Sequence, residues 1–494
     1  MYKRGCGILM PVFSLPSIEG IGNFGPEAYR FVDMLASHGV NYWQILPLNS
    51  GNPQNGESPY FSVSAFAINP LLISSGFLTN SGLLTASEIN EIPEMSSDII
   101  QYDKIRHWKM PLLTKAAERF VDDEFFEDFS KVQRFWLDDY ALFFALQQFF
   151  ATTWLSWPDS LRDRSLREMS EVNDKFNNVI RVCKVIQYFA WTQWQNLRGY
   201  CSRNGVTLIG DMPIYVSLES SDVWSNSSLF KLDQNKRPLA VSGVPPDYFS
   251  ATGQLWNNPV YNWEIHKREG FSWWIKRMRH LLSLYDIVRI DHFRGLVQFW
   301  EIPAGETSAI NGSWQDVPTI NFFDTLIEQV VPFSVICEDL GIITDDVREV
   351  IKHYGFFVMK VLQFAFSEDE TNPYLPHNYD TNCLVYTGTH DNLPTLGWLK
   401  KVAGERERSS IRQYTKRNSD DFDTVWDLIE FAMKSEAVIA VFPLQDILTL
   451  GEESRINDPS RVEGNWLWRW NPVNSPLGPA LSRLKRLIVH YERV

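Results

Sequence analysis

Short apolar or β-branched runs that end in polar residues, glycine or proline recur along the chain. Eight are clear, at 7–13, 41–47, 207–212, 287–293, 334–340, 357–364, 383–389 and 437–442. Stretches with helical spacing of apolar residues lie between most of them, at 26–37, 272–284, 322–331 and 344–353. This alternation is typical of parallel strands joined by crossover helices. Eight such units predict an α/β fold, a closed (β/α)8 TIM barrel that extends over residues 1–494 as a single domain.

Two gaps between the expected strands are too long to be simple crossovers. Residues 50–205 contain long helical patterns at 122–153 and 172–204, which predict a large, mainly helical insertion. Residues 217–284 are rich in turn signals before their final helix, and predict a smaller, loop-rich insertion between the third and fourth strands. The chain shows no internal repeat and no low-complexity linker, so we expect no separate C-terminal β domain.

Composition narrows the class of protein. Hydrophobic residues make up 44% of the chain and charged residues 21%, which is the balance of a globular protein. The net charge of −14 would repel nucleic acid and anionic membrane surfaces, and no apolar run is long enough to span a bilayer. The cysteines are few, odd in number and without C-x-x-C pairs, which favours a reducing cytoplasm; they are Cys6, Cys183, Cys201, Cys337 and Cys383.

The aromatic content is high, at 14% of residues with 19 tryptophans. Most of these side chains are expected to pack in the core. Sugar rings present apolar C–H faces that stack on indole and phenol rings, so a carbohydrate-binding cleft would account for the rest.

Acidic side chains follow four of the eight expected strands. In a TIM barrel, functional residues sit at the C-terminal ends of the strands. An aspartate at such a junction can also be a simple helix N-cap, but four acid-bearing strand ends in one chain favour a shared site. The residues concerned are Asp211, then Asp291 with His292, then Glu338 with Asp339, then His390 with Asp391.

Two of these acids have contexts that suggest different protonation states. Alternation along a strand places Arg289 and Asp291 on one face, so that the guanidinium should lower the pKa of Asp291 and hold it ionised, as a nucleophile must be. Glu338 follows an apolar run, where burial would raise its pKa and suit it to donate a proton. One charged and one protonated carboxyl are typical of glycosidic bond chemistry.

A metal centre is the competing use of these residues. His292 and His390 each adjoin an aspartate, but adjacent strand residues point to opposite faces, and neither H-x-H nor H-E-x-x-H spacing occurs. We therefore expect no catalytic metal. A single G-x-G-x-x-G match at 20–25 is a weak phosphate signal, and its proline and asparagine neighbours indicate a loop.

In their order and spacing, motifs along nearly the whole chain resemble those of glycoside hydrolase family 77, the 4-α-glucanotransferases called amylomaltase or disproportionating enzyme, in the α-amylase clan. The motifs are Ser14-Leu-Pro16, Gly20-Ile-Gly-Asn-Phe-Gly25, Tyr42-Trp-Gln-Ile-Leu-Pro47, Ser58-Pro-Tyr60, Ser64-Ala-Phe66, Gly210-Asp-Met-Pro-Ile-Tyr215, Gly243-Val-Pro-Pro-Asp247, Gly253-Gln-Leu-Trp256, Arg289-Ile-Asp-His-Phe-Arg-Gly295, Glu338-Asp-Leu-Gly341, Thr389-His-Asp-Asn392 and Glu463-Gly-Asn-Trp466. Two short stretches depart from the family pattern, at Glu57 and Phe61 beside Tyr60 and at Ile68 before Asn69-Pro70.

The resemblance implies a retaining double displacement that moves an α-1,4-glucan segment from a donor to the 4-hydroxyl of an acceptor glucan or glucose. It implies Asp291 as nucleophile, Glu338 as general acid/base and Asp391 as the third, transition-state-stabilising carboxylate. It further implies Tyr60, Asp211, Arg289 and His390 around them, with Asp247, Trp256 and Asn465 on loops that cover the donor and acceptor sites. No cofactor is implied, and the partners would be malto-oligosaccharides and α-1,4-glucans.

Two other functions fit the same residues. A hydrolase of the same clan would have identical carboxylates and differ only in using water as acceptor. A non-catalytic glucan-binding protein would account for the aromatic content, although the intact set of strand-end acids argues against it.

Overall fold

The computed structural model describes residues 2–246, 250–341, 343–367 and 369–494. Its centre is a closed barrel of eight parallel strands in the order β1-β12-β11-β10-β9-β6-β3-β2, with β1 paired to both β2 and β12. The expected TIM barrel is therefore confirmed, and each of the eight predicted runs contributes one strand. The strands are β1 (Gly5–Leu9), β2 (Tyr42–Gln44), β3 (Thr207–Met212), β6 (Ile287–Ile290), β9 (Val335–Cys337), β10 (Phe357–Val361), β11 (Cys383–Tyr386) and β12 (Ile439–Pro443).

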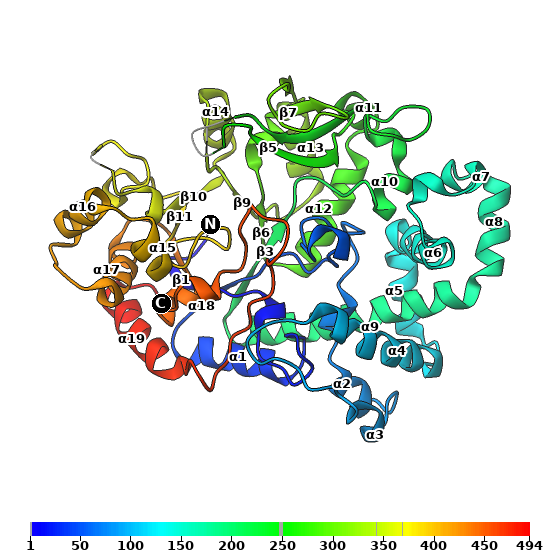
Figure 1. The fold of residues 1–494 in the computed structure, drawn as a ribbon, viewed down its shortest axis with the longest axis horizontal. Coiled ribbons are helices and arrows are strands. Elements are labelled where there is room, and N and C mark those ends of the chain that lie inside the picture. Colours follow the sequence, from blue (N-terminus) through cyan, green and yellow to red (C-terminus); the bar gives the residue numbers. More distant parts are fainter. Residues whose placement is uncertain (1, 247–249, 342, 368) are drawn as a thin grey trace.

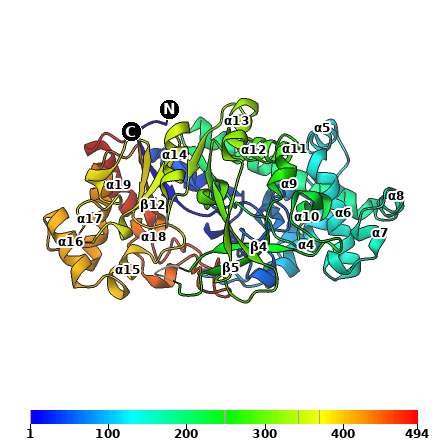
Figure 2. The same cartoon turned by 90° about the horizontal axis from the view of Figure 1, so that it is seen from above.

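Helices surround the barrel and bury one face against it (Figures 1 and 2). In α1 (Pro26–Ser37) the buried residues Ala28, Phe31, Val32 and Leu35 follow the i, i+3, i+4, i+7 spacing that faces a core, and proline occupies the first turn. Both α1 and α12 (Ser272–Leu284) begin and end where the apolar spacing predicts. The other helices of this layer include α13 (Thr319–Gln329), α14 (Asp345–Tyr354), α15 (Thr395–Lys401), α16 (Glu405–Thr415), α17 (Asp421–Lys434), α18 (Leu444–Ile447) and α19 (Leu477–His490).

The segment between β2 and β3 extends to one side of the barrel, at the right of Figure 1. It contains α2 (Ser75–Asn80), α3 (Ala86–Ile89), α4 (Tyr102–Arg119), α5 (Glu124–Val132), α6 (Arg134–Phe150), α7 (Asp159–Arg162), α8 (Leu166–Lys175) and α9 (Asn177–Arg203). Helix α9 packs on α4, α5 and α6 and also on α1 and β3, so it joins this segment to the barrel. Within the described parts of the chain, no helix has both the length and the apolarity needed to cross a membrane.

A second sheet, with strand order β5-β4-β7-β8, lies beside the barrel. Its antiparallel strands are β4 (Ala240–Val244), β5 (Gln254–Pro259), β7 (Gln298–Pro303) and β8 (Ser313–Asp316). The sequence pattern did not identify these strands, because they are short and β5 and β8 expose many of their side chains. Strands β4 and β5 precede β6 in the sequence, and β7 and β8 follow it. The sheet therefore includes residues beyond 217–284. Helices α10 (Ser221–Ser225) and α11 (Trp263–Arg268) also lie within that range, and α12 packs on β3 and β6.

Candidate active site

One buried arginine joins the acids at the ends of two neighbouring strands. Asp211 on β3 and Arg289 on β6 are register partners, and their side chains are 0% and 3% exposed. The Nη1 atom of Arg289 lies 2.8 Å from both carboxylate oxygens of Asp211. It also lies 3.1 Å from Oδ1 of Asp291, which follows β6. The predicted placement of Arg289 and Asp291 on one face is thus what the structure has, and Asp211 shares the same guanidinium.

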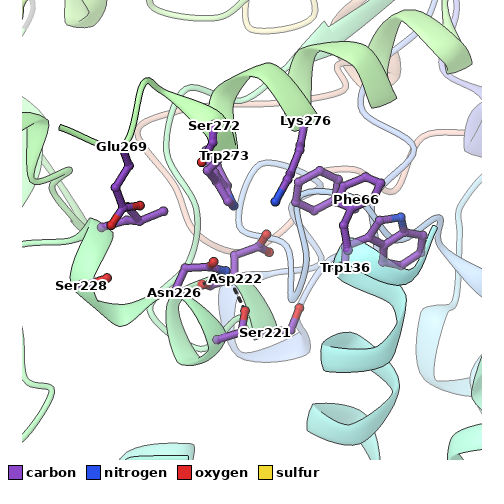
Figure 3. Close-up of a pocket in the computed structure, with 13 residues that line it drawn as sticks. Phe66, Trp136, Ser221, Asp222, Asn226, Ser228, Glu269, Ser272, Trp273 and Lys276 are labelled. Carbon is purple, nitrogen blue, oxygen red and sulfur yellow. Dashed lines mark hydrogen bonds between the residues drawn. The ribbon is translucent and has the colours of Figure 1, made fainter. Parts of the chain in front are cut away.

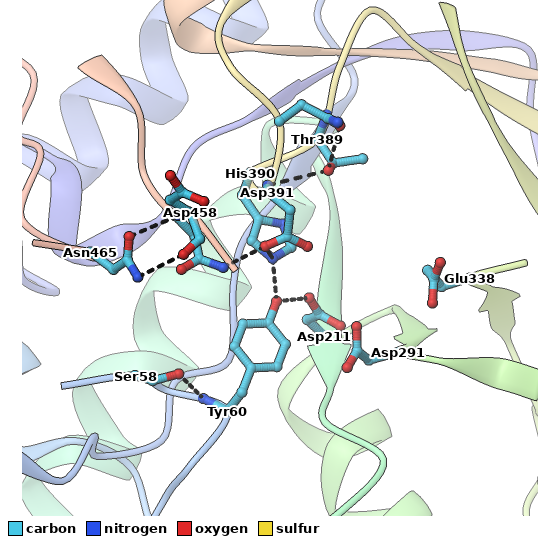
Figure 4. Close-up of polar contacts among 12 residues, drawn as sticks. Ser58, Tyr60, Asp211, Asp291, Glu338, Thr389, His390, Asp391, Asp458 and Asn465 are labelled. Atoms are coloured by element: carbon cyan, nitrogen blue, oxygen red, sulfur yellow. Dashed lines mark hydrogen bonds and ion pairs between the residues drawn. The ribbon is translucent and has the colours of Figure 1, made fainter. Parts of the chain in front are cut away.

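Tyr60 connects this pair to the opposite side of the barrel mouth (Figure 4). Its hydroxyl donates to Oδ2 of Asp211 at 2.6 Å and lies 2.8 Å from Nε2 of His390, and the Tyr60 and His390 rings are stacked, 5.5 Å apart. Burial raises the pKa of Tyr60 well above its usual range, so the hydroxyl keeps its proton. Because that proton goes to Asp211, we assign Nε2 of His390 as a donor to the Tyr60 oxygen. Burial lowers the pKa of His390, which keeps the ring neutral.

The segment that carries Tyr60 is fixed by the helices of residues 50–205. Arg106 of α4 donates from one nitrogen to both carboxylate oxygens of Glu57, at 2.7 and 2.9 Å. Gln187 of α9 accepts from the backbone N–H of Ile68 and donates to its carbonyl, both at 2.9 Å. The side chain of Glu57 and the backbone of Ile68, two positions that depart from the family pattern, are thus where helices α4 and α9 hold this segment.

Glu338, at the end of β9, is held by backbone groups. Its two carboxylate oxygens accept from the N–H groups of His292 at 2.8 Å and Leu340 at 3.0 Å. His292 points its N–H at Glu338 from a left-handed backbone conformation with φ of 48°, which is strained for a residue with a side chain. Burial raises the pKa of Glu338 to about 7, although Arg289 and the two N–H groups oppose the rise.

The pKa of Asp291 does not follow the sequence expectation. Arg289 does lower it, but burial, together with the negative charges of Asp211, Glu338 and Asp391, raises it well above the usual range of an aspartate. The expected net lowering is therefore wrong, because it considered only the strand neighbour. One guanidinium faces several carboxyls here, and neighbouring carboxyls of this kind bind protons as a group. A proton on one of them favours the charged form of the others.

Asp391 follows β11 and is held by a distant segment that the sequence reasoning missed. Asn457 donates from Nδ2 to Oδ1 of Asp391 at 2.6 Å and from its backbone N–H to the carbonyl of His390 at 3.1 Å. Arg455 donates to the carbonyl of Asp391 at 2.9 Å. His390 Nε2 is 3.4 Å from Oδ1 of Asp391. No signal in the sequence marked Asn457 or Arg455, since both lie in an irregular segment far along the chain from Asp391.

Asn465 lies on a loop, and its side chain is hydrogen-bonded within that loop. Its side-chain oxygen accepts from the N–H of Asp458 at 2.7 Å, and its Nδ2 donates to the carbonyls of Asp458 at 3.1 Å and Arg461 at 2.8 Å. These bonds close the loop 458–465, and Figure 4 shows Asn465 turned toward Asp458. The next residue, Trp466, was not among the candidates, yet its ring lies 5.7 Å from that of Tyr60 and 6.1 Å from that of His390.

Trp256 lies on strand β5, not on a loop as expected. Its ring meets the edge of His292 at a centroid distance of 4.9 Å and also contacts Tyr215 at 6.1 Å. Trp256 therefore stands next to the residue that presents its N–H to Glu338. Asp247 lies outside the described residues.

The structure thus brings together Asp211, Asp291, Glu338 and Asp391 with Arg289, Tyr60 and His390, as expected of a single site. Within the described part of the chain, no group of three or more His, Cys, Asp or Glu side chains is placed to hold a metal ion. When Glu338 carries a proton, Asp291 beside the guanidinium of Arg289 can be ionised and act as nucleophile, and Glu338 can act as proton donor.

Comparisons with known proteins show the family to which the chain is similar. The family model described as 4-alpha-glucanotransferase matches residues 10–474. A 4-alpha-glucanotransferase from Clostridium butyricum is 41% identical over 97% of this chain and 99% of its own, and one from Aquifex aeolicus is 41% identical over 94% and 95%. Among solved structures, an amylomaltase from Streptococcus agalactiae in complex with acarbose is 36% identical and superposes with a TM-score of 0.94, covering 99% of this chain and 100% of its own.

Proposed function

This chain belongs to the 4-alpha-glucanotransferase family, and from that premise we propose that Asp291, Glu338 and Asp391 carry out its reaction. The activity is that of a 4-α-glucanotransferase, an enzyme that moves α-1,4-glucan segments from a donor to an acceptor. Its substrates are malto-oligosaccharides or glucans, in keeping with a similar amylomaltase that binds acarbose. The roles of individual residues are the part that we propose.

The observation that carries this proposal is the placement of Asp291 against a guanidinium, with Glu338 beside it held by two backbone N–H groups. Burial and neighbouring carboxyls raise the pKa of both residues, to about 7 for Glu338. When Glu338 carries a proton, its charge no longer opposes ionisation of Asp291, and Arg289, 3.1 Å away, favours the charged form of Asp291. A nucleophile must be ionised and a general acid protonated, so Asp291 and Glu338 suit those two roles.

In the first half-reaction, a carboxylate oxygen of Asp291 attacks the anomeric carbon of the donor glucan. The bond from that carbon to the glycosidic oxygen breaks, and Glu338 gives its proton to this oxygen as the leaving glucan departs. The products are a covalent glycosyl-enzyme ester and an ionised Glu338. Loss of the proton from Glu338 adds negative charge, which the N–H groups of His292 and Leu340 stabilise.

In the second half-reaction, Glu338 takes the proton of the acceptor's 4-hydroxyl as that oxygen attacks the anomeric carbon. The ester bond to Asp291 breaks, and both carboxyls return to their starting states. Two displacements at one carbon retain its configuration. Asp391, fixed by Asn457, binds sugar hydroxyls and stabilises positive charge on the ring in both transition states.

The remaining side chains position these three. Arg289 holds Asp291 and Asp211, and Tyr60 links Asp211 to His390. Trp256 stands beside His292 and is half-buried, so its ring can offer a face to the sugar, whereas Trp466 is 3% exposed and packs against Tyr60 and His390. Water competes with the acceptor for the glycosyl-enzyme, so this aromatic shielding favours transfer over hydrolysis. Asn465 supports the site indirectly, through the loop that precedes Trp466.

The five cysteines are all free and buried, and we propose that the enzyme works in the cytoplasm, where such thiols stay reduced.

Incubation with maltotriose as the only sugar tests this function. We expect glucose together with oligosaccharides longer than maltotriose, detected by chromatography, because a second maltotriose serves as acceptor. Glucose accompanied by shorter products alone would instead identify a hydrolase, and no conversion would identify a binding protein. Nothing in the structure favours either alternative.

A further inference from the structure

A partly enclosed cavity lies away from the carboxyls, where the helices of residues 50–205 meet the barrel layer (Figure 3). Its volume is about 140 Å³, many times the space that a single water molecule needs. Four segments line it: Phe66 of the segment that carries Tyr60, the start of α6, residues 221–229 around α10, and the stretch from Glu269 into α12. None of the residues placed at the active site lines this cavity.

The cavity combines aromatic walls with polar groups. Trp136, Trp273 and Phe66 form the walls and are 6%, 6% and 3% exposed, and Phe135 lines the cavity at 38% exposure. Side chains of serine, asparagine, aspartate, glutamate and lysine supply the polar groups, namely Ser221, Asp222, Ser225, Asn226, Ser228, Glu269, Ser272 and Lys276. Flat apolar rings beside clustered donors and acceptors match the two kinds of surface on a pyranose ring.

One buried donor in this cavity has no partner. The indole Nε1–H of Trp273 is buried and makes no hydrogen bond, which is costly for a polar group away from water. In Figure 3 this nitrogen and the amine of Lys276 both point from α12 toward Asp222. Asp222 is 3% exposed, and its Oδ2 accepts from the N–H of Ala65 at 2.8 Å. A ligand with several hydroxyls could bridge the donors of α12 and the acceptors around Asp222.

Charges of both signs line the cavity. Asp222 and Glu269 would repel an anion, and Lys276 offsets only one of these two negative charges. A neutral polyhydroxyl compound can both donate to Asp222 and accept from Trp273 and Lys276. Since the substrates of the proposed function are chains of glucose units, glucose units are the neutral polyhydroxyl groups this enzyme meets.

We propose that this cavity is a second sugar-binding site, which takes one glucose ring, either free glucose or the end ring of a glucan, remote from the catalytic carboxyls. The proposal rests on the proposed function for the identity of the sugar. The cavity also contacts the Tyr60 segment, because Asp222 holds Ala65 and the backbone N–H of Ser221 donates to the carbonyl of Val63 at 2.9 Å. A sugar bound here would therefore stiffen the chain three to five residues from Tyr60.

Fluorine NMR on protein labelled with 5-fluorotryptophan tests the location of binding. The Asp291→Asn variant is used so that glucans are not consumed. The Trp273 signal is identified by its loss in Trp273→Phe, and the control signal by its loss in Trp274→Phe. Trp274 is a matched control because it is the next residue, is fully buried, also has an unpartnered Nε1–H, and does not line the cavity.

We expect the Trp273 signal to shift in a saturable way with glucose, or with maltose and maltohexaose if the end of a chain is required, while the Trp274 signal stays in place. In calorimetric titrations, Trp273→Phe should weaken this binding about three- to tenfold through loss of one hydrogen bond, and Trp274→Phe should not. A Trp273 signal that none of the three sugars moves would overturn the second site. The outcome is separable from the proposed function, because transfer from maltotriose by the unsubstituted enzyme is measured independently.

Discussion

The pKa of Glu338 makes the pH dependence of the reaction the sharpest test of its role. Burial raises this pKa to about 7. As general acid, Glu338 must be protonated, so activity should be lost as the pH rises through 7. The protonated fraction is one half at pH 7 and falls to about 1% at pH 9, so kcat/KM for maltotriose should fall about tenfold per pH unit above 7.

The assay compares two donors that differ in whether the leaving group must be protonated as it departs. Maltotriose requires a proton on the departing oxygen, whereas fluoride leaves from α-maltosyl fluoride without one. Initial rates of fluoride release should therefore show no fall in kcat/KM between pH 7 and 9. Glu338→Gln should keep a fluoride-release step close to that of the unsubstituted enzyme while losing several orders of magnitude on maltotriose.

Two results would refute this reasoning. If the fall above pH 7 were the same for both donors, the titrating group would not be the proton donor to the leaving oxygen. If Glu338→Gln were equally inactive on both donors, with binding of maltotriose retained, Glu338 would not be the acid.

Three further substitutions test the other roles. Asp291→Asn should lower kcat by several orders of magnitude with an unchanged melting temperature, since the amide cannot form the ester proposed for the carboxylate; activity within tenfold of normal would exclude Asp291 as nucleophile. Trp256→Ala should raise the ratio of hydrolysis to transfer, measured as reducing sugar against longer oligosaccharides, more than it slows release of the first product; an unchanged ratio would move the shielding to other residues. Asn457→Ala removes a 2.6 Å bond to the Asp391 carboxylate, and the loss of about 1.5–3 kcal/mol expected for a bond to a charged group predicts a 10- to 100-fold lower kcat/KM. Asn457→Asp should be worse still because it adds a like charge, and equal rates for the two variants would argue that Asn457 does not position Asp391.

The barrel could be predicted from the sequence because its strands carry a strong local signal. Parallel strands in a barrel are covered on both faces, so most of their positions are apolar, as in β11 and β12, where every residue is buried. The spacing of apolar residues in α1 and α12 predicted where each helix begins and ends, because one face of each helix must be apolar. The sheet β5-β4-β7-β8 has no such requirement, and its short strands with exposed positions carried no comparable pattern.

The candidate acids could also be located from the sequence, because they directly follow those apolar runs. The contact of Arg289 with Asp291 depends on strand alternation, which is a local property. How these acids are held depends on residues far apart in the chain. Tyr60 meets Asp211 and His390 across 151 and 330 positions, and no local pattern encodes such a contact.

The protonation of Asp291 was decided by the tertiary structure. The pKa of a carboxyl depends on its burial and on every charge nearby, and strand neighbours are only part of that environment. Asp291 therefore differed from expectation, because its burial and the charges of Asp211, Glu338 and Asp391 outweigh the effect of Arg289 on its pKa. Glu338 met the expectation, because the burial that its apolar run indicated was the dominant cause. The sequence by itself thus determined the barrel and which acids line its mouth, whereas folding decided their neighbours, and with them the distribution of protons on which the proposed chemistry depends.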